Sequence, residues 1–264
     1  MSATLAILAG YGALPQMLAA ANHEALFVSF EGVEVNVPLP RHFAASFNQF
    51  GTLFDTLHAG GITAVCFAGA MTRPALNPAA FDVQTMQLAP RLMGAMAGGD
   101  DGLLREIIAV FEEQGFEVLG AHQILPELVA KSGLIAGKTP DSDSDAKRGL
   151  DILAALSGMD VGQGVVVANG LCLGVETLQG TDAMLGFVAA TPANLRQSGG
   201  VFVKAAKQGQ DLRVDMPAIG PDTVASVASA KLAGIVIAAD QVMILERAKT
   251  IKAVEAAGLF LLAL

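Results

Sequence analysis

Cysteine is scarce in this chain, which has only Cys66 and Cys172 among its 264 residues. Two cysteines in apolar surroundings are too few for a disulfide scaffold, so we expect two buried thiols that stay reduced. Basic residues are also few, because 16 Lys and Arg stand against 25 Asp and Glu, for a net charge of −9. This balance excludes the basic surface that sequence-independent nucleic-acid binding requires, and no nucleic-acid partner is expected.

Long apolar runs are missing as well. No uninterrupted run reaches the roughly 18 residues of a membrane-spanning helix. The apolar start of the chain is broken by Gly10, Gly12 and Pro15 and follows no Lys or Arg, unlike a signal peptide. We therefore expect a cytoplasmic protein. Hydrophobic residues make up 53% of the chain, which is enough to bury a core and excludes disorder.

The first half alternates short apolar runs with amphipathic segments. This alternation predicts an α/β fold with a Rossmann-like parallel sheet, in a domain spanning residues 1–131. The predicted strands cover residues 4–9, 25–30, 62–68 and 116–119, and the predicted helices cover residues 15–21, 51–59 and a segment that begins at Asp100.

The composition changes near Lys131, where Gly, Pro, Ser and Asp predict a linker over residues 132–143. A second, mixed α/β domain is expected over residues 144–264. Its strongest local signal is Asn169-Gly170 between two apolar runs, which predicts a type I′ hairpin. Further helices are expected over residues 146–156, 180–189, 221–232 and 246–256, and strands over 201–205, 234–239, 242–245 and 259–262.

Two glycines lie between the first predicted strand and helix. Gly10-Tyr11-Gly12 has the strand–turn–helix setting of a phosphate-binding loop, and Glu31 ends the next strand where a dinucleotide fold places its ribose-binding acid. Pro15 replaces the third glycine of that motif, so the match is partial. A tight turn that needs glycine for its backbone angles explains the same residues.

Carboxylates and one histidine offer further candidates in the first half. Asp100 and Asp101 follow Gly98-Gly99 at a helix start, where they either cap the helix or reach a metal or a sugar hydroxyl. His122 follows the fourth strand and is a candidate substrate-binding residue. The four histidines of the chain show no metal-binding spacing.

The second half brings acids and cations into the same stretches. Glu176, Thr181 and Asp182 follow the hairpin, and Lys204 and Lys207 precede Arg213 and Asp215. Such pairs suit a polyphosphate with a divalent metal, although surface ion pairing also explains them. Asp215 lies in a strand-like stretch, where an extended backbone would direct Arg213 to the same face.

Seven short motifs occur along the chain in one order. They are GYGALP (10–15), CFAGAMTRP (66–74), GDDGLLR (99–105), GAH (120–122), GQGVVV (162–167), VETLQGTDAML (175–185) and RVDMPAIG (213–220). Together they resemble the LpxI family of UDP-2,3-diacylglucosamine pyrophosphatases of lipid A biosynthesis. Tyr11 departs from the family pattern, which usually has a third consecutive glycine there.

The resemblance implies two domains that hold the substrate between them. Water would attack the α-phosphorus, releasing UMP and 2,3-diacylglucosamine 1-phosphate (lipid X) with Mg²⁺ or another divalent metal. The essential aspartate of the family corresponds to Asp215. We expect substrate contacts from Gly10, Tyr11, Gly12, Gly69, His122, Thr181, Asp182, Lys204, Lys207 and Arg213, and metal ligands among Asp215, Glu176, Asp182, Asp100 and Asp101.

An amphiphilic substrate and product imply transient contact of the protein with the inner face of the inner membrane. The sequence leaves open whether the chain forms a homodimer. Two other functions remain compatible with the residues alone. Gly10, Gly12 and Glu31 would serve an NAD(P)-dependent oxidoreductase, and the same acids could bind a nucleotide sugar and metal without turnover.

Overall fold

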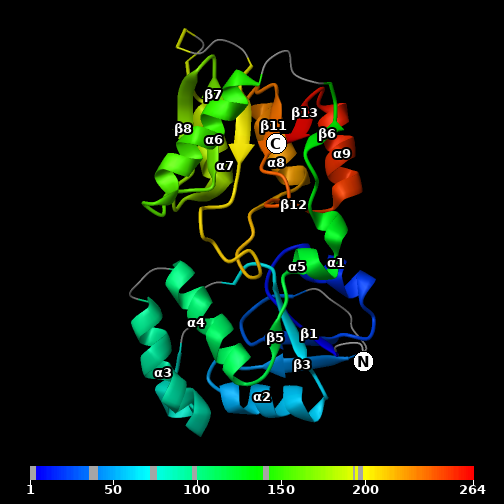
Figure 1. Cartoon of the computed structure of the whole chain (residues 1–264), viewed down its shortest axis with the longest axis vertical. Helices are drawn as coiled ribbons and strands as arrows, with labels where there is room; N and C mark the ends of the chain where they lie inside the picture. The colour runs from blue at the N-terminus through cyan, green and yellow to red at the C-terminus, as the bar shows by residue number, and fades with distance from the viewer. Residues whose placement is uncertain are drawn as a thin grey trace. The chain divides into compact units, whose positions relative to one another are not determined.

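The computed structural model describes residues 4–35, 41–71, 76–96, 100–138, 143–192, 194–195 and 199–264 (Figure 1). The chain is α/β and forms two compact units. Unit 1 consists of Met1–Pro126 together with Arg213–Asp215, and unit 2 consists of Glu127–Leu212 and Met216–Leu264. A three-residue segment from the second half of the sequence therefore belongs to the unit built by the first half.

Unit 1 contains a five-stranded parallel sheet in the order β3-β2-β1-β4-β5. The chain leaves β1 in one direction to build β2 and β3, and in the other to build β4 and β5. The change of direction lies between β1 and β4, which is where open α/β sheets bind ligands. The strands are β1 (Leu5–Ala9), β2 (Leu26–Phe30), β3 (His42–Ala45), β4 (Ala64–Ala68) and β5 (Glu117–Val118).

Helices cover the sheet of unit 1 because its strands are apolar on both faces. Alternate strand residues such as Leu8 and Val65 pack with Phe54 and Phe111 into one buried core. The rings of Phe54 and Phe111 meet edge to face, with centroids 5.1 Å apart. The helices are α1 (Leu14–Ala21), α2 (Phe50–Ala59), α3 (Val83–Met96), α4 (Asp100–Glu113) and α5 (Ala121–Ile124), with a short 3₁₀ turn η1 (Pro78–Ala80).

Unit 2 contains a six-stranded mixed sheet in the order β6-β13-β11-β9-β7-β8 and a two-stranded parallel pair, β10-β12. In the larger sheet β13, β11 and β9 run parallel, while β6, β7 and β8 form antiparallel pairs with their neighbours. The strands are β6 (Gly133–Ala136), β7 (Gly164–Ala168), β8 (Leu171–Val175), β9 (Val201–Lys204), β10 (Ala218–Ile219), β11 (Gly234–Ile237), β12 (Met243–Ile244) and β13 (Phe260–Ala263).

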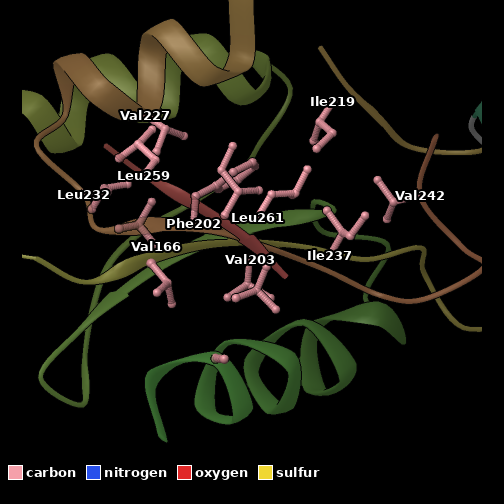
Figure 2. Packing of buried hydrophobic residues seen from close by; sticks show 14 of the residues in the cluster. Val166, Phe202, Val203, Ile219, Val227, Leu232, Ile237, Val242, Leu259 and Leu261 are labelled. Carbon is pink, nitrogen blue, oxygen red and sulfur yellow. The ribbon is translucent and has the colours of Figure 1, made fainter. Parts of the chain in front are cut away.

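Buried hydrophobic residues pack on both faces of the larger sheet in unit 2. Figure 2 shows Val203 on the side of α6 and Val227 of α8 on the opposite side. Gly149 of α6 allows the close approach, because a Cβ there would lie 2.5 Å from Cγ2 of Val203. The remaining elements are η2 (Pro126–Leu128), α6 (Ser144–Ser157), α7 (Gly180–Ala189), α8 (Pro221–Ser229) and α9 (Arg247–Ala256).

The Asn-Gly hairpin prediction is confirmed. Asn169 and Gly170 have φ of 50° and 75°, as a type I′ turn requires, and they join β7 to β8. The carboxylate of Asp145 accepts hydrogen bonds from the backbone N–H groups of Asn169 and Gly170, at 2.8 and 2.7 Å. The turn is therefore held by the first turn of α6 as well as by its own backbone.

Some local predictions were wrong or incomplete. Both thiols were expected to be buried, but only Cys66 is, and Cys172 is exposed. Residues 133–136, expected in a linker, form β6 and pair with β13, because their apolar side chains extend the sheet. Residues 139–142 of that expected linker lie outside the described part of the chain. The strand β3 and the helix α3 were not predicted from the sequence. The helix α3 contains Pro90 in its interior, and proline normally ends a helix. Within the described residues, no helix is both long and apolar enough to cross a bilayer.

Candidate active site

The loops after β1 and β4 lie in contact at the carboxyl end of the sheet in unit 1. Tyr11 donates its N–H to the carbonyl of Ala70 at 2.7 Å, and Ala70 donates in return at 2.9 Å. A Cβ on Gly10 would lie 2.4 Å from the carbonyl oxygen of Ala70, and one on Gly69 would lie 2.6 Å from that of Tyr11. Both glycines are therefore required by close backbone approach at the topological switch point.

Gly12 and Tyr11 form the outer part of the same loop. Gly12 has φ of 107°, which an L-residue rarely adopts, and the Tyr11 side chain is exposed. The helix α1 begins two residues later with Pro15 in its first turn. The N–H groups of Gly10 and Tyr11 are used within the two loops, and Pro15 has none. The loop therefore offers fewer backbone donors than a G-x-G-x-x-G loop.

The turn between β5 and α5 places His122 beside a glycine. The N–H of Gly120 donates to the side-chain oxygen of Gln123 at 2.7 Å. This hydrogen bond caps the start of α5, which begins at Ala121. A Cβ on Gly120 would lie 2.6 Å from Cε1 of His122 and 3.1 Å from Cα of Arg213. Burial lowers the pKa of His122, and its Nδ1 is enclosed without a hydrogen-bond partner in the structure. The imidazole is therefore neutral near pH 7.

The segment Arg213–Asp215 is anchored in unit 1 through two side chains. Val214 packs against the core that contains Phe111, and Nη1 of Arg213 lies 2.8 Å from a carboxylate oxygen of Glu112 in α4. Residues 212–214 form a turn and Asp215 has irregular backbone, so the expected strand was wrong. Asp215 is half-buried, and it is held by its anchored neighbours rather than by a sheet.

A second group of candidate residues lies in unit 2, on the face of the sheet that α7 covers. The buried ammonium of Lys204, at the end of β9, lies 2.7 Å from Oγ1 of Thr181 and 3.3 Å from a carboxylate oxygen of Glu176. Its Nζ is also 6.0 Å from the centre of the Phe202 ring. Lys204 therefore orients the acid after β8 and the hydroxyl at the start of α7.

Gly164, which was not among the predicted site residues, leaves the space that the Glu176 side chain occupies. A Cβ on Gly164 would lie 2.5 Å from Oε2 of Glu176 and 2.9 Å from the Phe202 ring. The β7–β8 hairpin brings Glu176 to Gly164, whose carbonyl accepts the Glu176 N–H at 2.8 Å, and the pairing of β7 with β9 adds Lys204 and Phe202. In the sequence, the motif Gly162-Gln163-Gly164 was the signal that could have indicated Gly164.

The remaining candidates have partners of their own. Asp182 accepts a hydrogen bond from the hydroxyl of Ser226 at 3.1 Å, and Lys207 forms an ion pair with Asp160. The helix α4 begins at Asp100, so Asp100 and Asp101 lie in its first turn, but their side chains are outside the described part. Among the described residues, no three His, Cys, Asp or Glu side chains gather as a metal site.

Comparisons with known proteins cover nearly the whole chain. The family model of the LpxI N-terminal domain matches residues 4–128, and that of the LpxI C-terminal domain matches residues 131–262. A protein of Caulobacter vibrioides named UDP-2,3-diacylglucosamine pyrophosphatase LpxI is 37% identical over 270 residues, which cover 98% of this chain and 96% of that protein. The two family models meet within a few residues of the boundary between the units.

Proposed function

The chain belongs to the LpxI family, and from this membership we propose that it hydrolyses the pyrophosphate of UDP-2,3-diacylglucosamine. The observation that carries the proposal is the similarity, along almost the full length of both chains, to a protein named for that activity. The products would be UMP and 2,3-diacylglucosamine 1-phosphate, through attack of water on the α-phosphorus.

Asp215 is the group that we assign to the attacking water. A carboxylate accepts a proton from water or directs its lone pair, and either role needs a fixed position. Val214, packed against the core of unit 1, fixes the backbone on one side of Asp215 whether or not Arg213 stays paired with Glu112. Pro217, two residues after Asp215, is buried and limits the backbone on the other side.

Phosphate charge would be offset by Arg213 and Lys207. The planar guanidinium of Arg213 suits a phosphate, which would compete with Glu112 for it. Lys207 would exchange its exposed partner Asp160 for a phosphate oxygen in the same way. Lys204 is buried against Glu176 and Thr181, so we assign it the positioning of those two groups.

The donor set is compatible with Mg²⁺ bound mainly by the substrate. Magnesium in phosphate sites commonly binds one or two protein carboxylates together with oxygens of the substrate phosphates. Asp215 alone would therefore supply enough protein ligands. Glu176 fits less well, because the Lys204 ammonium already neutralises its carboxylate. Bound there, the ion would polarise the phosphate that is attacked and neutralise developing charge.

One assay separates this proposal from the two other functions. The purified chain is incubated with UDP-2,3-diacylglucosamine and Mg²⁺, and UMP is measured. We expect UMP release that stops with excess chelator and returns with added Mg²⁺. A nucleotide-sugar-binding protein would bind the substrate without releasing UMP, and an oxidoreductase would instead quench nicotinamide fluorescence. No UMP from folded protein would refute the proposal, and release unaffected by chelator would refute only the metal requirement.

A lipid-linked substrate also requires access to a membrane surface, and we propose that α3 provides it. Val83, Met86, Pro90 and Met93 recur at helical spacing and are exposed. The opposite side of α3 contains Thr85, which is buried. The helix contains Arg91 and no acid, in a chain whose net charge is −9. It therefore offers an apolar stripe without carboxylates to repel anionic lipid.

A further inference from the structure

The Tyr11 side chain is an exposed aromatic ring on a firmly held backbone. It is 68% exposed, and it follows β1 at the topological switch point of the sheet in unit 1. Its N–H and C=O both pair with Ala70, and Gly10 and Gly69 pack at this contact without space for a Cβ. The backbone therefore holds the ring in solvent at the edge where open α/β sheets bind ligands.

The carboxylate of Glu31 lies at the same edge, directly after the neighbouring strand β2. Its N–H donates to the carbonyl of Ala45 at 3.0 Å, which extends the pairing of β2 with β3. The parallel register sets Leu8 beside Val28 and, continued by three residues, sets Tyr11 level with Glu31. Glu31 is exposed, and in the part of the chain that the structure describes its carboxylate forms no ion pair.

This part of the edge suits a neutral ligand group better than a phosphate. A carboxylate repels phosphate, and it accepts hydrogen bonds from hydroxyl groups. The N–H groups of Gly10 and Tyr11 are already used within the two loops, and Pro15 has none. A flat aromatic face beside an acceptor of hydroxyl protons instead matches a nucleoside, whose base stacks and whose ribose donates.

The groups that suit phosphate lie on the other side of the switch point in the same unit. Gly120 follows β5, and a Cβ there would lie 3.1 Å from Cα of Arg213, which unit 1 contains together with Asp215. In the sheet, β4 separates β1 from β5, so two strand spacings of roughly 10 Å in total separate these loops. This is about the reach of a nucleoside with its first phosphate.

We propose that Tyr11 and Glu31 bind the uridine of the substrate, with the uracil ring stacked on Tyr11 and the ribose hydroxyls donating to Glu31. The inference rests on the proposed function, which supplies a uridine nucleotide as the ligand. A uridine in this place directs its α-phosphate towards Arg213 and Asp215. It also gives Glu31 a role in a chain whose first loop lacks the third glycine of a dinucleotide-binding motif.

The fluorescence of Tyr11 tests base stacking directly, because the chain has one tyrosine and no tryptophan. We expect UMP to quench the emission of the full chain in a saturable manner. Ribose 5-phosphate, which lacks the base, should leave the emission unchanged. Free N-acetyltyrosinamide at the same UMP concentrations provides the correction for light absorbed by the nucleotide.

Calorimetric titration with UMP measures what the ring contributes to binding. Tyr11→Ala should raise the Kd at least about fivefold, and Tyr11→Phe should stay within about twofold of the wild type because it keeps the ring face. Phe187→Ala is the matched control, since it removes an aromatic ring that is 70% exposed in unit 2, and it should leave the Kd unchanged. The side chains are exposed, so we expect wild-type melting temperatures.

The ribose contact is tested with dUMP, which lacks the 2′-hydroxyl. The wild type should bind UMP about tenfold more tightly than dUMP, because a hydroxyl that donates to a carboxylate forms a charge-assisted hydrogen bond. Glu31→Ala should remove this preference. Glu24→Ala, at an exposed acid before the opposite end of β2, is the control and should keep it.

Hydrolysis of UDP-2,3-diacylglucosamine separates this inference from the proposed function. Tyr11→Ala should raise the KM at least about fivefold and change kcat little, because the ring contacts the base and not the reacting phosphate. Three results would overturn the inference in a chain that releases UMP: emission that UMP leaves unchanged, equal quenching by ribose 5-phosphate, or an unchanged KM in Tyr11→Ala. Specific quenching by UMP in a folded chain without hydrolysis would support the nucleoside site and refute the proposed function.

Discussion

Asp215 owes its position to neighbours that no local pattern reveals. Asp215→Asn removes the carboxylate charge and keeps the shape of the side chain. We expect turnover to fall at least about a hundredfold, the low end for a positioned acid–base group, with the melting temperature unchanged. Asp55→Asn, at an exposed acid of α2, is the control. Retained activity, or loss that accompanies unfolding, would make Asp215 a structural residue.

Gly164 illustrates a residue that matters through the space it leaves. In Gly164→Ala the new Cβ would displace Glu176 and crowd Phe202, so we expect a loss of about 1–3 kcal/mol in unfolding free energy. Gly158→Ala is the matched control, because that position has open space and φ of −65°. Urea unfolding compares the two variants, and equal stability would mean that the Glu176 side chain moves aside without cost.

His122 should make stability depend on pH in one direction. Burial lowers its folded-state pKa below the ordinary 6.5, so the unfolded chain binds the proton first as the pH falls. Stability from this residue is therefore present above pH 6.5 and is lost as the pH falls from there to the lowered pKa. Melting temperatures between pH 7.5 and 5 should fall more steeply in the wild type than in His122→Gln. The exposed His23→Gln should behave as the wild type, and identical slopes in all three would contradict the prediction.

At the scale of elements, the β7–β8 hairpin combines a local signal with distant support. Asp145→Ala removes two charge-assisted hydrogen bonds to the turn, and we expect a loss of about 1–3 kcal/mol in unfolding free energy. Asp151→Ala, at an exposed acid of the same helix, should cost less. If chemical denaturation finds the two variants equal, the Asn-Gly turn is stable without α6.

Predicted and observed elements agree best where apolar residues follow a strict period. The segments around β1, β4, α2 and α7 were predicted to within a few residues. The failures have physical causes. Pro90 lies inside α3 on its exposed side, where water can hydrogen-bond the carbonyl that the missing N–H of proline leaves without its helical partner. Residues 133–136 become a strand because β13 offers an edge, and composition carries no information about that partner.

At the scale of the whole molecule, weak attachment to lipid is the expected behaviour. The chain should float with vesicles through apolar contact, so high salt should not release it. Met86→Asp combined with Met93→Asp on α3 should reduce the bound fraction about tenfold, because two apolar contacts become charged. Met159→Asp in unit 2 is the control at another exposed methionine. Release by salt alone would indicate electrostatic attachment and contradict the prediction.

The sequence by itself determined the α/β class, the hairpin, the glycines of the first loop and the family. Each follows from neighbouring residues or from motifs in order along the chain. Tertiary structure alone decided that Gly10 and Gly69 are in contact, that Lys204 of β9 lies against Glu176, and that Arg213–Asp215 belongs to unit 1. These facts depend on which strands pair and on which core accepts Val214. Pairing and packing bring together residues that are distant in sequence, so no local pattern contains them.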